Sequence, residues 1–189
     1  GSCDNLFCVD NVEISYNKEL HSREFFAEAG TTYHLLVSSS SFGVASNYVL
    51  KLSEYDIPQN DKCVNALSVN ISLSSTFFGS TIGALPDFFD GSCGVSSTSR
   101  GVWHSFVGSG KLTRLEYQMA ILGNNNDREL SIFTGHCDNL FCLVNVEGGG
   151  YNATPAVHEF IAEAGTTYYL LLSGKSFITT SVYELKVSE

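Results

Sequence analysis

Short stretches of alternating apolar and polar side chains recur along the whole chain. The clearest lies at 102–107, where one face of an extended segment carries Val102, His104 and Phe106. A period of two residues is typical of β-strands. The same reasoning predicts further strands at 6–13, 23–29, 32–38, 48–52, 67–72, 75–82, 112–118 and 130–133. Many short strands with frequent turns, and no long amphipathic helix, predict an all-β fold: an antiparallel, jelly-roll-like β-sandwich.

The chain also contains an internal repeat. Residues 1–15 align with 135–149, and residues 16–54 align with 151–189 after one extra glycine, with 32 of 54 aligned positions identical. The offset of about 135 residues is the length of one domain rather than of a solenoid unit. The pattern therefore predicts tandem domains.

Two domain assignments follow from the repeat. We predict that residues 56–189 form one complete β-sandwich repeat. Residues 1–55 are predicted to be the C-terminal half of a preceding repeat, with the fold of 135–189. The rest of that first domain would come from chain outside these 189 residues or from a neighbouring subunit, because a half-sandwich has open edges. Residues 55–61 form a short polar junction that holds adjacent domains close.

Composition excludes two classes of partner. Acidic residues outnumber basic ones by 20 to 10, giving a net charge of −10, whereas nucleic-acid binding requires clustered Lys and Arg. No apolar run approaches the roughly 20 residues that span a bilayer. The 43% hydrophobic content supplies ample material for a core.

Six cysteines suggest disulfides and an oxidising compartment. A Cys-x4-Cys pair recurs with the repeat, which favours local bridges within each copy and leaves two cysteines to pair with each other. The predicted bridges are Cys3–Cys8, Cys137–Cys142 and Cys63–Cys93. A zinc site is disfavoured because no Cys-x2-Cys or neighbouring His pair is present.

Two sequons agree with secretion. Asn70-Ile71-Ser72 and Asn152-Ala153-Thr154 match the N-glycosylation pattern. We therefore predict glycans at Asn70 and Asn152, although Asn17, the counterpart of Asn152 in the first copy, is not followed by the required residues.

No residue pattern indicates catalysis. The chain lacks a Gly-x-Ser-x-Gly elbow, and residues 108–111, which resemble a phosphate loop, lack its first glycine and its Ser or Thr after Lys111. His104 in mid-strand is interpreted as structural. The glutamates that recur at Glu24 and Glu28, and again at Glu159 and Glu163, are interpreted as having a structural or surface role. We predict no catalytic residue, no cofactor and no metal site.

Some side chains suit either a sugar or calcium site or an ordinary role in packing or turns. Aromatic side chains at Phe88, Phe89, Tyr117 or Tyr151 offer surfaces on which a sugar ring stacks, but aromatic residues also fill sandwich cores. Oxygen ligands at Asp87, Asp90 or the 124–127 turn suit calcium, but an Asn-rich turn needs no ion.

Several segments, taken in order, resemble the bacterial pre-peptidase C-terminal (PPC)-like β-sandwich modules. They are residues 60–66, Gly94, 102–106, 127–137 and 164–169. The resemblance implies a jelly-roll-like sandwich of a kind appended to secreted enzymes or strung along adhesins and fibres, generally without catalytic activity. The chain departs from the family at His104, where a tyrosine is common, and at residues 10–11 and 144–145, which replace an acidic stretch.

Together these observations predict a non-catalytic, extracellular or cell-surface structural and adhesive repeat, a building block of a surface fibre or filament. The expected partners are identical or similar domains joined head to tail, N-linked glycans and a polysaccharide. The alternative is a carbohydrate-binding accessory module of a secreted protein.

Overall fold

The computed structural model describes residues 6–9, 11, 25–38, 47–71, 74–87, 92–95, 99–120, 128–148, 155–174 and 182–189. The chain divides into two compact units, Gly1–Glu54 and Tyr55–Glu189.

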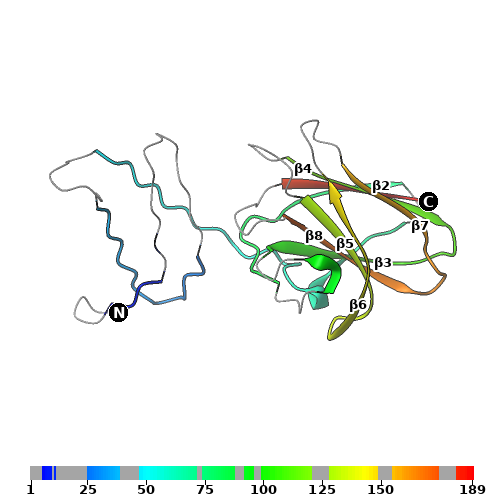
Figure 1. Cartoon of the computed structure of the whole chain (residues 1–189), viewed down its shortest axis with the longest axis horizontal. Helices are drawn as coiled ribbons and strands as arrows, with labels where there is room; N and C mark the ends of the chain where they lie inside the picture. The colour runs from blue at the N-terminus through cyan, green and yellow to red at the C-terminus, as the bar shows by residue number, and fades with distance from the viewer. Residues whose placement is uncertain are drawn as a thin grey trace. The chain divides into compact units, whose positions relative to one another are not determined.

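The described part of the larger unit consists of nine β-strands and two short 3-10 helices (Figure 1). The strands are β1 (Leu67–Ser68), β2 (Ser75–Ser80), β3 (Gly101–Val107), β4 (Leu112–Ala120), β5 (Arg128–His136), β6 (Asn139–Gly148), β7 (Ala156–Ile161), β8 (Thr167–Gly174) and β9 (Val182–Ser188). The 3-10 helices are η1 (Cys63–Asn65) and η2 (Ser92–Gly94).

These strands form two sheets. One has five strands in the order β1-β3-β8-β5-β6, and the other has four in the order β2-β9-β4-β7. Every described pairing is antiparallel except that of β1 with β3. The predicted all-β, antiparallel β-sandwich is confirmed.

The main hydrophobic core lies between the two sheets. Ile132 and Leu170 from the five-stranded sheet meet Leu115, Leu185 and Val187 from the four-stranded sheet, and all five are fully buried. Burying one such side chain contributes about 1.5–3 kcal/mol, so this layer is the main source of stability.

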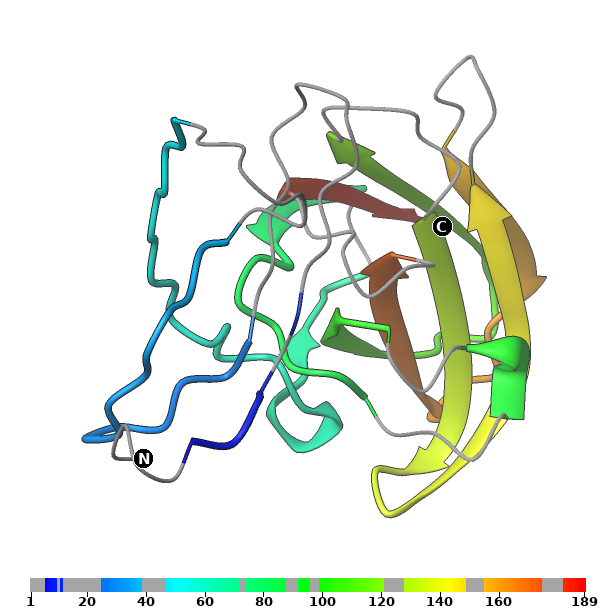
Figure 2. The same cartoon turned by 60° about the vertical axis from the view of Figure 1, so that its left-hand side comes forward.

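A second cluster covers the outer face of the five-stranded sheet. Trp103, Phe133 and Leu171 point away from the main core, yet each is at most 1% exposed. Segments around η1 and η2 pack over them, and η2 lies beside β6 (Figure 2). Because both faces of the sheet are covered, β3, β5 and β8 are buried almost continuously instead of alternating.

The predicted junction, residues 55–61, contains two buried residues. Asn60 and Asp61 are 5% exposed and belong to the larger unit. Asn60 forms two hydrogen bonds with the main chain of Trp103: its carbonyl accepts from the Trp103 amide at 2.8 Å, and its Nδ2 donates to the Trp103 carbonyl at 2.9 Å. Two residues of the predicted polar junction are therefore buried and hydrogen-bonded within the larger unit.

In the smaller unit, the described residues contain a turn at Ala29–Gly30 but no strand. The strands predicted at 6–13, 23–29, 32–38 and 48–52 are therefore not formed in its described part. The physical reason is that a strand needs a hydrogen-bonded partner. The equivalents of these segments in the larger unit pair with strands drawn from residues 75–136.

Candidate functional site

Two disulfides define the most distinctive chemistry of the larger unit. Cys63 is bonded to Cys137 and Cys93 to Cys142, with Cα–Cα distances of 5.5 and 5.3 Å. The predicted bridges Cys63–Cys93 and Cys137–Cys142 are wrong. All four cysteines are nevertheless in disulfides, as the sequence indicated.

The β5–β6 hairpin explains the pairing. Cys137 lies in the turn after β5, whereas Cys142 lies on β6 opposite Phe133 of β5. Helix η1 brings Cys63 to the turn, and η2 brings Cys93 to β6, with Cys93 in the left-handed backbone region at φ 70°. Each bridge therefore fastens a covering segment to the edge of the five-stranded sheet.

The remaining predicted site residues lie in or near the part of the chain that is not described. Cys8 is exposed, and its predicted partner Cys3 lies outside the described residues, so that bridge stays a prediction. Asn70 is exposed, as a glycan requires, and its carbonyl accepts a hydrogen bond from Ser75 Oγ at 3.3 Å. Asn152 lies outside the described residues. Glycosylation at both asparagines stays a prediction.

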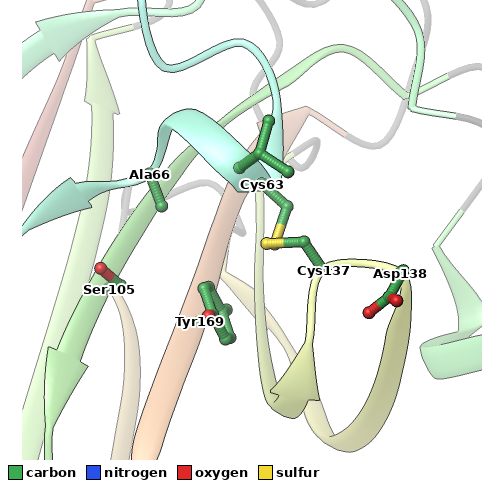
Figure 3. Close-up of a pocket in the computed structure, with 7 residues that line it drawn as sticks. Cys63, Ala66, Ser105, Cys137, Asp138 and Tyr169 are labelled. Atoms are coloured by element: carbon green, nitrogen blue, oxygen red, sulfur yellow. A yellow bond between two sulfur atoms is a disulfide. The ribbon is translucent and has the colours of Figure 1, made fainter.

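An open depression of ≈ 470 Å³ borders the first disulfide (Figure 3). It is lined by Cys63, Val64, Ala66, Ser105, Cys137, Asp138 and Tyr169. Its polar groups are two hydroxyls, from Ser105 of β3 and Tyr169 of β8, and the exposed carboxylate of Asp138 in the β5–β6 turn. Such groups accept and donate hydrogen bonds, and the tyrosine ring offers an apolar surface.

The depression does not hold a serine–histidine pair. Ser105 and His104 are neighbours in a strand, so their side chains point to opposite faces of the sheet. His104 is 2% exposed and points into the main core, where its Nε2 lies 2.7 Å from the Tyr183 hydroxyl. Burial lowers the pKa of His104 to about 4. The imidazole is therefore neutral at physiological pH and engaged in packing, in agreement with its interpretation as structural.

A buried polar cluster at the start of the larger unit was not predicted. Asp87 Oδ1 accepts a hydrogen bond from Trp103 Nε1 at 3.2 Å, and Asp61 Oδ1 accepts one from the Leu85 amide at 2.7 Å. Burial raises the pKa of both carboxyl groups, that of Asp87 to about 7. The polar pair Asn60-Asp61 just before a cysteine was visible in the sequence, but nothing there indicated that it would be buried.

The residues considered for sugar and calcium binding have different outcomes in the structure. Tyr117 is fully buried, with its hydroxyl donating to the Ser173 carbonyl at 3.3 Å, so it offers no surface to a sugar. Phe88, Phe89, Asp90, Tyr151 and residues 124–127 lie outside the described residues. Among the residues that the structure describes, no three His, Cys, Asp or Glu side chains are grouped to hold a metal ion.

The segment resembling a phosphate loop is a turn packed against the β7–β8 connection. The Gly108 amide donates to the Thr166 carbonyl at 2.8 Å and the Gly110 amide to the Ala162 carbonyl at 2.7 Å. Lys111 Nζ lies 3.0 Å from a carboxylate oxygen of Glu189. These amides are therefore not directed toward a phosphate. The surface role of Glu159 holds too, since it is exposed and forms an ion pair with Arg114.

No protein-family model matches the chain, and no curated protein matches it. Among solved structures, it is similar to PliG of Aeromonas hydrophila, a periplasmic inhibitor of g-type lysozyme, with 10% identity over 65% of this chain and 94% of that chain and a TM-score of 0.41. It is also similar to the pre-peptidase C-terminal domain of a Bacillus anthracis collagenase, with 18% identity over 65% and 95% of the chains and a TM-score of 0.38. A third is the Yersinia pseudotuberculosis-derived mitogen, with 14% identity over 62% and 86% of the chains and a TM-score of 0.36.

These likenesses are too distant to carry an argument about function. The fold and the site by themselves define a disulfide-braced β-sandwich module. Its two bridges are typical of proteins kept outside the reducing cytosol. In the described parts of the chain, no helix has the length and apolar character needed to cross a membrane.

Proposed function

We propose that the chain is a non-catalytic structural module of an extracellular array, and that its two disulfides limit how far the sandwich can be extended under tension. The main support for this proposal is the Cys63–Cys137 disulfide, which joins residues 74 positions apart. One end is η1, at the start of the larger unit, and the other is the β5–β6 turn. The loop so closed contains β1 to β5.

A covalent loop of this size changes what tension can do. Force applied to the two ends of the chain passes through the Cys63–Cys137 bond, so the residues between them cannot be stretched while the bond is intact. The second bridge, across 49 positions, holds η2 to β6 and overlaps the first loop. Stretching can therefore extend only the remainder of the chain.

Further support comes from the side chains that carry chemistry. His104 is engaged with Tyr183, Asp87 accepts from the Trp103 indole, and four cysteines are oxidised. Each of these groups is engaged in contacts within the fold. The expected partners are further domains of the same kind, joined head to tail, and N-linked glycans on the surface.

Single-molecule stretching tests the proposal. The chain is held by its two ends and unfolded with and without a reductant. Reduction should lengthen the unfolded chain by about 250 Å, which is the 74-residue span at roughly 3.4 Å per residue. Equal lengths in both conditions would show that the bridge bears no load and would refute the proposal.

A matched control separates the two bridges. The double variant Cys93→Ser/Cys142→Ser keeps Cys63–Cys137, so its oxidised form should unfold to the wild-type length. Negative-stain images of native material then test the array directly, because fibres support the proposal and isolated globules contradict it.

The depression beside Tyr169 favours carbohydrate binding as a second candidate. Its volume of ≈ 470 Å³ falls within the range of about 300–1,000 Å³ usual for ligand pockets. Both the partly exposed ring of Tyr169 and the exposed side chain of Asp138 line it. A glycan array tests this candidate. Specific binding that is lost in Tyr169→Ala supports it, and an array without a specific signal rejects it.

A further inference from the structure

The turn at Ala29–Gly30 reproduces the β7–β8 connection of the larger unit in detail. The Glu28 amide donates to the Tyr33 hydroxyl at 3.0 Å, as the Glu163 amide does to that of Tyr168 at 3.0 Å. The two glycines at the corresponding turn position, Gly30 and Gly165, have φ of 78° and 79°.

Ring packing next to the turn is also shared. The ring centroids of Phe25 and Tyr33 are 5.1 Å apart, and those of the equivalent Phe160 and Tyr168 are 5.1 Å apart. The smaller unit therefore already holds the local geometry of the larger one, although its described residues form no strand.

The two copies differ in how far their equivalent apolar side chains are buried. Leu170 and Leu172 of β8 are 0% exposed, whereas their equivalents Leu35 and Val37 are 54% and 49% exposed. Leu185 of β9 is 0% exposed, and its equivalent is Leu50 at 53%. Side chains that make the core in one copy therefore face solvent in the other. Apolar surface of this kind marks an interaction site.

The larger unit shows what covers these positions. Strand β8 lies between β3 and β5, and β9 lies between β2 and β4. All four covering strands come from residues 75–136, which precede the repeated segment. The sequence of the smaller unit holds no copy of them.

Association of the chain with itself cannot supply the missing strands. The chain holds two copies of the C-terminal half, at 1–54 and 135–189, and one N-terminal half. Exchanging halves between molecules preserves this ratio, so one C-terminal half per molecule always lacks these four strands.

We infer that the exposed apolar side chains of Gly1–Glu54 bind a segment equivalent to residues 75–136, completing a second β-sandwich. Residues 3–5 repeat the sequence of Cys137-Asp138-Asn139 at the β5–β6 turn. In the larger unit, this turn connects the covering strand β5 to the start of the repeated segment. Binding at residues 1–54 does not depend on whether the larger unit bears load.

The completed domain should also contain a specific pair of disulfides. Cys3 and Cys8 occupy the places of Cys137 and Cys142. In the completed domain, each should therefore bond to an equivalent of Cys63 or Cys93 in the added segment, in place of the Cys3–Cys8 bridge predicted from the sequence. In a glutathione refolding buffer, two thiols lose two electrons and two protons to oxidised glutathione, which leaves as two molecules of reduced glutathione. The same bridges that brace the larger unit would then brace the smaller one.

The test adds the missing half to the full chain. Residues 55–134 are duplicated ahead of Gly1, and amide hydrogen exchange is followed at residues 32–38 and 48–52. We expect exchange there to slow by about 100-fold or more relative to the parent chain, because these amides join ladders. Peptide mapping should show Cys3 and Cys8 bonded to the added segment.

A matched variant and the parent chain complete the test. The same fusion with Leu35→Asp and Leu50→Asp should lose this protection, while β8 and β9 of the larger unit stay protected. Unchanged exchange at 32–38 in the fusion would overturn the inference. Protection in the parent chain that rises with concentration, with dimers in sedimentation, would also overturn it by showing that a second copy is the occupant.

Discussion

The Nε2 atom of His104 lies 2.7 Å from the hydroxyl of Tyr183, and this hydrogen bond joins the two sheets through the middle of the core. His104 comes from β3 and Tyr183 from β9, and both are at most 5% exposed. The rings also meet edge to face, with centroids 5.7 Å apart. A buried polar pair of this kind contributes to stability only while both partners keep their protonation states.

The pair predicts a pH-dependent stability. Burial lowers the pKa of His104 to about 4, below the unfolded value of 6.5, so the unfolded chain binds more protons between these limits. Stability due to His104 is therefore present above pH 6.5 and is lost as pH falls toward 4, by about 3 kcal/mol in total. Asp87 acts in the opposite sense, since its pKa is raised to about 7 and its stabilising protonated form is lost as pH rises.

The measurement removes the opposing group first. In Asp87→Asn, the free energy of unfolding from urea titration is compared at pH 7.5 and pH 4 with that of Asp87→Asn/His104→Gln. The destabilisation caused by His104→Gln should be about 3 kcal/mol smaller at pH 4, where His104 no longer contributes. A destabilisation independent of pH would show that His104 titrates normally in the folded protein.

The disulfide pairing could not be predicted correctly from the sequence. The recurrence of Cys137 and Cys142 as a Cys-x4-Cys pair favoured a bridge between them. In the structure, however, Cys142 lies on β6 opposite Phe133 and Cys137 lies in the turn. Which segment lies within reach of each cysteine depends on how η1 and η2 cross the sheet. Those segments have no periodic pattern, so their positions could not be predicted.

Other features could be predicted from the sequence because they depend on local chemistry. The alternation at 102–107 predicted a strand, and these residues do form one, within β3. The sequence also correctly assigned a structural role to His104. It missed the second hydrophobic cluster around Trp103 and Phe133, because alternation predicts one buried face and cannot reveal that irregular segments cover the other.

Peptide mapping under non-reducing conditions should find Cys63 linked to Cys137 and Cys93 to Cys142. Removing either bridge should lower the free energy of unfolding by about 4 kcal/mol in the chain-entropy relation, because the two spans of 74 and 49 residues are similar on a logarithmic scale. The pairs of Cys→Ser variants are compared by denaturant titration. Fragments linking Cys63 to Cys93 would contradict the structure.

Loss of the tyrosine hydroxyl at the β7–β8 turn should lower the stability of the larger unit, whereas the same change at the equivalent tyrosine of the smaller unit should not. Tyr168 is 3% exposed and its hydroxyl accepts from the Glu163 amide at 3.0 Å, so Tyr168→Phe should cost the larger unit about 1 kcal/mol. Tyr33 makes the equivalent bond to Glu28 in the other unit. Tyr33→Phe is therefore the matched control and should leave the unfolding transition of the larger unit unchanged. Equal losses from both variants would contradict this assignment.

Gly79 in β2 leaves the space that Tyr183 occupies. A Cβ added at Gly79 would lie 2.5 Å from Cζ of the Tyr183 ring, closer than atoms approach in proteins. Gly79→Ala should therefore push this ring away from His104 and lower the free energy of unfolding by about 1–3 kcal/mol, as overpacking does. The neighbouring Phe78 is 76% exposed, so the control Phe78→Ala should change stability by no more than about 0.5 kcal/mol. In NMR titrations, Gly79→Ala should also shift the pKa of His104. Wild-type stability together with an unchanged His104 titration would show that Tyr183 does not fill this space.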